Sequence, residues 1–167
     1  RPTIEKLDGQ GADSGSTKGG DQVTISGLNF GPSSTKPTDI KVTYGPPLNV
    51  AKYSARNCTV KVPHRQIECL TAEGVGKDHT WQVSIVDLTS DPSGATSSYG
   101  EPQIKSMVDS ATKEVRNPMT AVTTGFTLIE VKGHNFGDNI ATMKFDGEPV
   151  ENVNYVDDDN LKFNTPV

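Results

Sequence analysis

Two cysteines offer the clearest chemistry in this 167-residue sequence. Cys58 and Cys69 fall on two consecutive predicted strands, in "NCTVKV" and "QIECL", with "VPHR" at the turn between them. A hairpin of this kind can bring the two Cβ atoms within disulfide reach. Because no other cysteine competes, we expect a bridge, which would place the protein in an oxidising compartment. Two buried free thiols are the alternative, since a small core also accepts them.

A possible glycosylation site overlaps the first cysteine. Asn57, Cys58 and Thr59 form the only N-x-Ser/Thr pattern in the chain, and this pattern is the acceptor for N-linked glycans in secreted proteins. It therefore points to the same compartment as the cysteine pair. An unmodified Asn57 is the alternative, because such patterns arise by chance and a disulfide at the middle residue can limit attachment.

Two further segments resemble ligand-binding loops but fail their patterns. "GVGKD" at 74–78 would need Gly at Thr71 and Ser or Thr at Asp78 to bind phosphate, so we interpret it as a loop between strands. The acidic run "DDDN" at 157–160 lacks the alternating spacing and distal Glu of a calcium loop, and a solvated turn is favoured.

Nothing in the sequence predicts catalysis or a bound cofactor. His64, His79 and His134 are too dispersed for a metal site and are interpreted as surface or strand-edge residues. No Gly-x-Ser-x-Gly motif appears. Trp81, the single tryptophan, alternates with Val83 and Ile85 and is expected in the core. We expect no catalytic residue, no metal and no cofactor.

The composition predicts an all-β protein. Val, Ile and Thr together make 42 residues, whereas Leu and Ala make 15, and β-branched residues favour strands over helices. The net charge is −5. Because Lys and Arg are not clustered, nucleic acid is an unexpected partner. No apolar run could insert into a membrane, and the opening "RPTIEKL" suggests a fragment or a processed chain.

A five-residue motif occurs twice, as "GLNFG" at 27–31 and "GHNFG" at 133–137. We interpret each copy as a structural turn at the end of a strand, in which Gly permits close approach or positive φ, Asn bonds the backbone and Phe covers the core. The predicted turn residues are Gly27, Asn29, Phe30, Gly31, Gly133, Asn135, Phe136 and Gly137.

The motif belongs to a longer repeat that predicts two domains, residues 1–100 and 101–167. About seven short alternating segments follow one another in the first copy, and "EPQIKSM", "FTLIEVKGHNFG", "ATMKFDG", "EPVENVNYV" and "NLKFNTPV" repeat their order in the second. The second copy has no counterpart of "TWQVSIVDL", so we expect it to lack its last two strands. The linker "SSYGEPQI" is short, and Pro102 should stiffen it.

These segments resemble the IPT/TIG family of immunoglobulin-like domains. The resemblance is carried by "VTISGLNFG", "KVTYG", "IECLTAEGVGK" and "WQVSI" in the first copy, and by "VKGHNFG", "MKFDG" and "LKFNTP" in the second. It implies two tandem β-sandwiches without catalytic activity, similar to modules of multi-repeat extracellular surface proteins.

The expected function is therefore a non-enzymatic structural or adhesion module of a cell-surface, coat or filament protein. Its partners would be neighbouring repeats or copies of the same protein. A receptor ectodomain that binds ligand through a sandwich-end loop is an alternative, with "YGPPLNV" at 44–50 as the candidate loop. An intracellular DNA-binding or dimerisation sandwich is a further alternative. The second domain would be completed either by downstream residues or by a strand from a partner.

Overall fold

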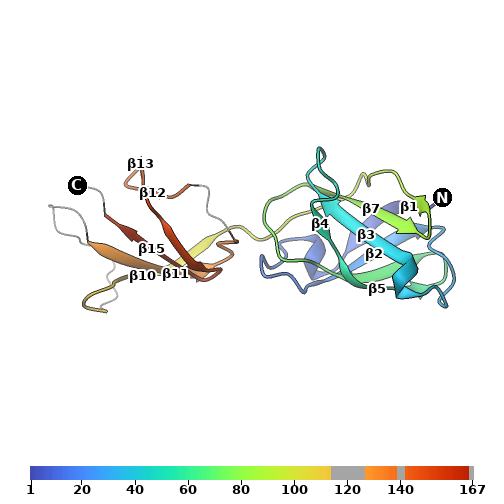
Figure 1. Ribbon diagram of the computed structural model, residues 1–167, viewed down its shortest axis with the longest axis horizontal. Helices are drawn as coiled ribbons and strands as arrows, with labels where there is room; N and C mark the ends of the chain where they lie inside the picture. Colours follow the sequence, from blue (N-terminus) through green and yellow to red (C-terminus); the bar gives the residue numbers. More distant parts are fainter. Residues whose placement is uncertain (114–126, 139–141, 166–167) are drawn as a thin grey trace. The chain divides into compact units, whose positions relative to one another are not determined.

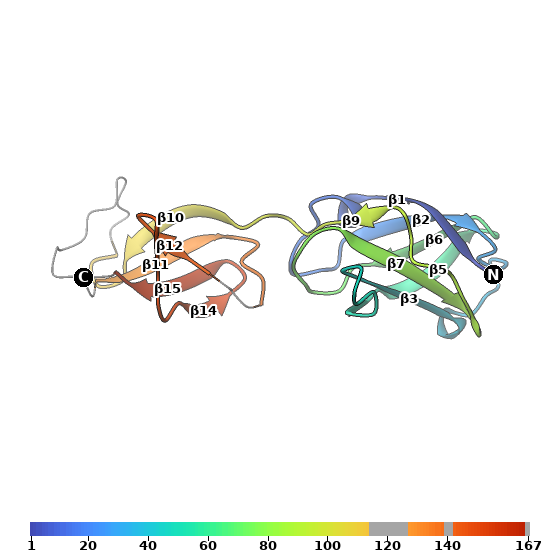
Figure 2. The same cartoon turned by 90° about the horizontal axis from the view of Figure 1, so that it is seen from above.

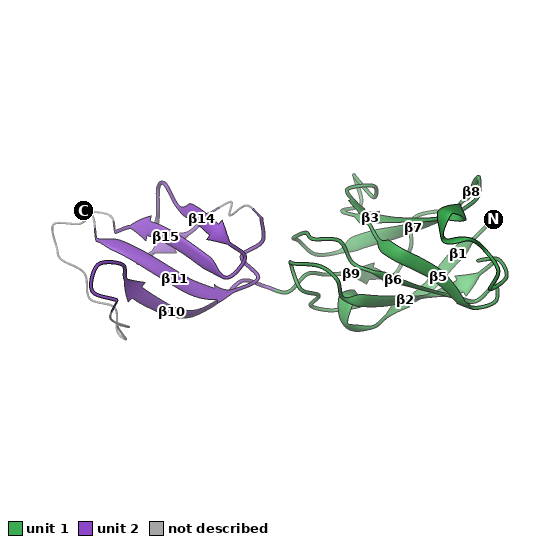
Figure 3. Ribbon diagram, turned by 60° about the horizontal axis from the view of Figure 1, so that its bottom comes forward, with its two compact units in different colours: residues 1–100 green, residues 101–167 purple. Residues whose placement is uncertain are grey.

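The computed structural model describes residues 1–113, 127–138 and 142–165. These residues form β-strands and two short 3-10 turns without any α-helix, which confirms the all-β prediction. The chain divides into two compact units, residues 1–100 and 101–167, and each has its own hydrophobic core (Figure 3). Within the described residues, we find no helix with the length and apolar character needed to span a bilayer.

Unit 1 is built from nine strands and two 3-10 turns (Figure 1). They are β1 (Thr3–Asp8), η1 (Gln10–Ala12), β2 (Gln22–Leu28), η2 (Pro37–Asp39), β3 (Ile40–Gly45), β4 (Tyr53–Ser54), β5 (Arg56–Val62), β6 (Gln66–Leu70), β7 (His79–Ile85), β8 (Leu88–Thr89) and β9 (Thr96–Ser97).

The strands of unit 1 form two antiparallel sheets (Figure 2). The first has the order β1-β2-β6-β5, and the second has the order β4-β3-β7-β8 with β9 also paired to β7. The first and last segments of unit 1 lie at opposite ends of the unit (Figure 3). We call them the N-terminal end and the C-terminal end of unit 1.

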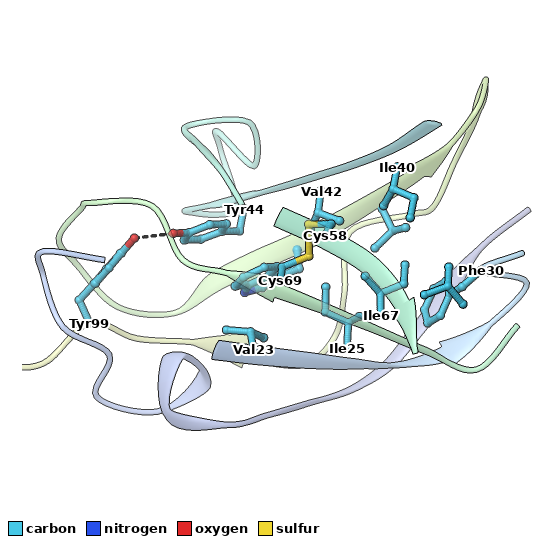
Figure 4. Close-up of a cluster of buried hydrophobic side chains, with 13 residues drawn as sticks. Val23, Ile25, Phe30, Ile40, Val42, Tyr44, Cys58, Ile67, Cys69 and Tyr99 are labelled. Carbon is cyan, nitrogen blue, oxygen red and sulfur yellow. Dashed lines mark hydrogen bonds between the residues drawn. A yellow bond between two sulfur atoms is a disulfide. The ribbon is translucent and has the colours of Figure 1, made fainter. Parts of the chain in front are cut away.

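The core of unit 1 follows from the alternation of its strands. Because successive side chains of a strand point to opposite faces, a two-residue period buries one face of each sheet. Val23 and Ile25 of β2 are fully buried (Figure 4). Trp81 of β7 is also fully buried, which confirms its expected place in the core. Trp81 stacks on Tyr44 of the paired strand β3, with ring centroids 4.1 Å apart.

A disulfide joins the two cysteines within the first sheet. Cys58 of β5 and Cys69 of β6 have Cα atoms 4.2 Å apart, and both side chains are buried in the core (Figure 4). The bridge therefore links neighbouring strands of one hairpin rather than the two sheets. No free cysteine is left.

Unit 2 contains a second four-stranded antiparallel sheet and a short hairpin. Its strands are β10 (Gln103–Asp109), β11 (Leu128–His134), β12 (Lys144–Phe145), β13 (Glu148–Pro149), β14 (Asn154–Asp157) and β15 (Asn160–Asn164). The sheet has the order β10-β11-β15-β14, and β12 pairs with β13. Ile129, Val131, Phe136, Leu161 and Phe163 form its buried core.

The four-stranded sheets of the two units share their strand order. β10, β11, β15 and β14 pair in the sequence in which β1, β2, β6 and β5 pair, and β1 and β10 are bulged at matching points. β14 thus takes the place of β5 in this order. Among the described residues β12 pairs only with β13, whereas β3 pairs with both β4 and β7.

Candidate interaction surface

The repeated motif forms the same turn in both units. Asn29 and Asn135 have φ angles of 62° and 58°, and each donates its side-chain amide to a carbonyl at the start of its unit. These carbonyls belong to Arg1 and Glu101, at 3.0 Å and 3.3 Å. Left-handed backbone suits Asn better than most residues. The backbone conformation and the side-chain hydrogen bond therefore both favour Asn at this position.

Glycine begins the motif because another strand lies against its backbone. A Cβ atom built on Gly27 would stand 1.9 Å from the Thr3 carbonyl oxygen, and one on Gly133 would stand 1.9 Å from that of Gln103. The glycines that end the motif, Gly31 and Gly137, have φ angles of 84° and 73°. The first glycine therefore provides space and the last provides left-handed backbone.

A hairpin turn packs on each copy of the motif. In unit 1 this is the turn between β5 and β6. The Phe30 amide donates to the His64 carbonyl at 3.4 Å, and the His64 amide donates to the Gly31 carbonyl at 2.7 Å. In unit 2 the Phe136 amide donates to the Asp158 carbonyl at 3.0 Å. Phe30 is fully buried and Phe136 is 5% exposed. Each phenylalanine thus covers its core beneath a bonded turn.

The acidic run at 157–160 is part of this turn in unit 2. Asp158 is buried, and its carboxylate accepts the Gly137 amide at 2.8 Å. Asp157 accepts the Asp159 amide at 2.8 Å and the Asn160 side-chain amide, and these bonds lower the pKa of Asp157. The expectation of a solvated turn is therefore wrong for Asp158, which is buried and whose carboxylate accepts a hydrogen bond from the backbone of the neighbouring motif.

A cleft of about 510 Å³ opens at the N-terminal end of unit 1. Three turns that are distant in the sequence meet there: the repeated motif at Asn29 and Gly31, the β5–β6 turn at His64, and the β7–β8 turn. Arg1 and Pro2, which precede β1, also line the cleft. The fold of the sandwich thus brings together segments that share no sequence pattern, and these segments form the cleft.

The β7–β8 turn gives the cleft an exposed apolar rim. Val86 is 68% exposed and Leu88 is 59% exposed, and both line the cleft with Ile85. Val86 also has a φ angle of 55°, an unusual conformation for a β-branched residue. Its amide is held by the Asp39 carbonyl at 2.8 Å. Strained backbone of this kind concentrates at binding surfaces.

Two of the residues that line the cleft, Arg1 and Asn29, have their polar groups engaged in hydrogen bonds. Arg1 donates from Nη2 to Asp91 at 2.7 Å and from Nε to the Thr89 carbonyl at 2.6 Å. Asn29 is bonded to the Arg1 carbonyl. Among the cleft residues we find no Ser, Thr or Cys beside His64 that could act as a nucleophile. The described part of the chain also contains no cluster of three or more His, Cys, Asp or Glu suited to a metal ion.

A tyrosine and histidine cluster lies toward the C-terminal end of unit 1. His79 makes edge contacts with the rings of Tyr44, Tyr53 and Tyr99, with centroids 5.5 to 6.1 Å apart. It is 2% exposed, so the expectation that it lies at the surface or a strand edge is wrong. The reason is that it begins β7 on the face that also carries Trp81 and Val83.

The cluster fastens the "GVGKD" segment as a structural loop. The Tyr53 hydroxyl bonds both the amide and the carbonyl of Val75, at 3.1 Å and 3.0 Å. The hydroxyls of Tyr44 and Tyr99 are hydrogen-bonded to each other (Figure 4). Both also bond the backbone of Ala72. Burial raises the pKa of both Tyr44 and Tyr99. This loop packs on aromatic rings, and the amides of Gly74, Val75 and Asp78 are hydrogen-bonded within unit 1.

His79 retains one unsatisfied polar atom. Its Nε2 lies 3.2 Å from the Val75 carbonyl, while its Nδ1 is buried and has no hydrogen-bond partner among the described residues. Burial lowers the pKa of His79, and the hydrogen bond to Val75 opposes that shift. A neutral ring that donates from Nε2 satisfies this geometry, because only the Nδ1 lone pair is then left unpaired.

The structure places the other predicted residues as follows. Asn57 is exposed beside the disulfide on β5, and His64 and His134 are also exposed. In "YGPPLNV", Tyr44 is buried but Leu48 is fully exposed. Leu48 follows Gly45, which pairs with Thr80 at the start of β7, so its loop lies at the end of β7 opposite Val86. The exposed rim at Val86 and Leu88 was not predicted from the sequence. Its one sequence signal is apolar residues that continue past the last alternating position of β7.

The fold and its internal bonding define a disulfide-linked, immunoglobulin-like β-sandwich. A model of the IPT/TIG domain family matches residues 11–100, more than half of the chain. The chain belongs to the IPT/TIG domain family.

Two solved structures are similar over nearly the whole chain. One is the full extracellular region of plexin A4, with 18% identity, a TM-score of 0.47, and coverage of 99% of this chain and 15% of that one. The other is SGBP-B from a complex xyloglucan utilization locus in Bacteroides uniformis, with 18% identity, a TM-score of 0.41, and coverage of 99% and 42%. This chain thus spans less than half of either structure. No curated protein matches the sequence.

Proposed function

We propose that this chain is a non-enzymatic structural or adhesion module of an extracellular protein, built from two consecutive IPT/TIG domains of a tandem array. Its partners are neighbouring repeats or copies of the same protein.

The repeated turn is the observation that carries the proposal. Both units contain an Asn in left-handed backbone bonded to the start of the unit, and a Gly pressed against the first strand. These matching contacts support a second domain of the same kind in residues 101–167, beyond the range of the family match. A module repeated in this way suits a spacer, because each copy reproduces the same rigid turn and core.

The disulfide supports the extracellular location. Cys58 and Cys69 are bridged and buried, and disulfides persist mainly in oxidising compartments. Apart from the Nδ1 atom of His79, the buried polar groups described above are engaged in turns and loops, which favours a structural role over catalysis.

The test is the redox state and location of the protein in its native source. Cells are treated with a membrane-impermeant biotinylation reagent and then lysed under a thiol-alkylating reagent. We expect the biotinylated protein to carry unalkylated Cys58 and Cys69, which become alkylated only after reduction. A Cys58→Ala/Cys69→Ala variant is the control for the mass change. Alkylated cysteines in an unlabelled intracellular pool would contradict the proposal.

A receptor ectodomain is the second candidate, and the cleft at the N-terminal end of unit 1 favours it. Val86 and Leu88 are exposed at its rim, and its volume of about 510 Å³ lies in the range of known ligand pockets. If this surface binds a ligand, Leu88→Ser should weaken adhesion of the chain to its native cells, whereas Leu48→Ser, at the opposite end, should not. Equal adhesion by both variants would exclude the cleft.

A further inference from the structure

We infer that Asn57 carries an N-linked oligosaccharide on the outer side of edge strand β5. This inference rests on the proposed extracellular location, because the transferase and its sugar donor act on secreted chains. The attached group belongs to the class of asparagine-linked oligosaccharides.

A β-bulge separates the disulfide at Cys58 from the glycan acceptor at Asn57, which are adjacent in the sequence. Arg56 pairs with Leu70 and Thr59 pairs with Glu68, so Asn57 and Cys58 together stand opposite the single residue Cys69. The extra residue of a bulge is left out of the ladder. The bulge therefore accommodates a disulfide at Cys58 and a free side chain at Asn57 in adjacent positions.

The two residues differ sharply in exposure. Cys58 is 6% exposed and bonded to Cys69, whereas Asn57 is exposed and has a φ angle of 54°. The disulfide faces the core, and the amide that would carry the sugar does not. The bridge thus leaves the acceptor side chain accessible in the folded protein, which removes the main objection raised by the sequence.

The surroundings of Asn57 suit a hydrated glycan. β5 is the last strand of its sheet, and its other exposed residues are Arg56, Lys61 and Val62, of which the first two are charged. An exposed strand edge can pair with another chain. A bulky, solvated glycan at the bulge would occupy the space along that edge and would direct contacts with neighbours to other surfaces.

The modification balances as a simple group transfer. Nδ2 of Asn57 loses a proton and forms a bond to the anomeric carbon of an oligosaccharide. The bond from that carbon to its lipid-linked diphosphate donor breaks, and the diphosphate leaves with the electron pair. The Thr59 hydroxyl completes the pattern that the transferase recognises.

The experiment uses the full chain secreted from eukaryotic cells as wild type, Thr59→Ala and Thr59→Ser. Intact mass is measured before and after an amidase that removes the glycan and leaves aspartate, and separately before and after reduction. We expect the amidase to shift wild type and Thr59→Ser, with aspartate at position 57 in the peptide map, and to leave Thr59→Ala unchanged. All three should keep the disulfide.

The outcomes separate this inference from the proposed function. A secreted wild type with an intact disulfide and no amidase shift would overturn the glycan at Asn57 while the extracellular proposal stands. A chain retained in the cell with free thiols would count against both. Because Thr59 is replaced rather than Asn57, the bulge keeps its left-handed asparagine in every variant.

Discussion

At the scale of single residues, the repeated glycines act through the space they leave. Gly27 and Gly133 each lie where a Cβ atom would collide with the carbonyl of the neighbouring first strand and with the ring of the motif phenylalanine. Both collisions involve groups fixed by packing, so a side chain there cannot be accommodated by a rotamer change alone.

Gly27→Ala should therefore destabilise unit 1 by about 2 to 3 kcal/mol, because the β1–β2 pairing must separate to admit the methyl group. The free energy of unfolding is measured with urea, using the fluorescence of Trp81. Gly94→Ala is the matched control, since a Cβ atom at Gly94 meets nothing within 4 Å. Equal stabilities of the two variants would show that β1 does not lie against Gly27 in solution.

His79 is the residue that should give unit 1 a dependence on pH. Burial is the main cause that lowers the pKa of His79, and the charge of Lys52 lowers it further. The hydrogen bond to Val75 and the charge of Asp78 oppose this shift. The unfolded chain, with a histidine pKa near 6.5, therefore binds more protons than the folded chain in mildly acidic solution. The contribution of neutral His79 is fully present above pH of about 6.5 and is lost as the pH falls below that value.

We expect the urea midpoint of unit 1 to fall between pH 7 and pH 5.5 in the wild type, and to fall less in His79→Phe, which keeps a ring among the tyrosines. His64→Asn is the control, because that residue lies in an exposed turn and Asn also suits its φ angle of 61°. If the urea midpoint of His79→Phe falls with pH as steeply as that of the wild type, groups other than His79 cause the pH dependence.

At the scale of elements, the β5–β6 hairpin is the most heavily constrained part of unit 1. Its strands are joined by the disulfide, its turn is bonded to the repeated motif, and Ile67 contributes a fully buried side chain. Its bulge also brings Cys58 opposite Cys69. The hairpin therefore couples the covalent link, the turn and the core.

Removal of the bridge by Cys58→Ala/Cys69→Ala should lower the free energy of unfolding by about 3 kcal/mol, because a short loop in the unfolded chain is no longer closed. The loss should match that seen when wild type is unfolded under reducing conditions. A reduced wild type as stable as the oxidised form would mean that the bridge adds little to the hairpin.

At the scale of the whole molecule, each unit has the means to fold separately. Unit 1 buries thirteen core residues and contains the disulfide, and unit 2 has a separate cluster around Ile129 and Phe163. Trp81 reports on unit 1 alone, since it is the only tryptophan.

Residues 1–100 alone should therefore unfold at the same urea midpoint as unit 1 in the full chain. In the full chain, Phe163→Ala should leave the urea midpoint of the Trp81 transition unchanged. Val83→Ala should lower the free energy of unfolding of unit 1 by about 2 kcal/mol. An unfolded 1–100 fragment, or a Trp81 transition that moves with Phe163→Ala, would show that unit 1 depends on unit 2.

The sequence by itself determined the all-β class, the buried strand at Trp81 and the family resemblance of the first hundred residues. These features are local. Alternation with a period of two indicates a strand wherever one face is buried, and Gly and Asn mark turns because few other residues tolerate their backbone angles.

Only the tertiary structure decided the cleft, the surroundings of His79 and the burial of Asp158. Each depends on segments far apart in the chain: the cleft joins Arg1 to Leu88, and His79 meets tyrosines from three separate segments. Asp158 is buried because its hairpin folds onto Gly137. No local pattern encodes such contacts, because the pairing of the sheets, rather than residue spacing, brings these groups together.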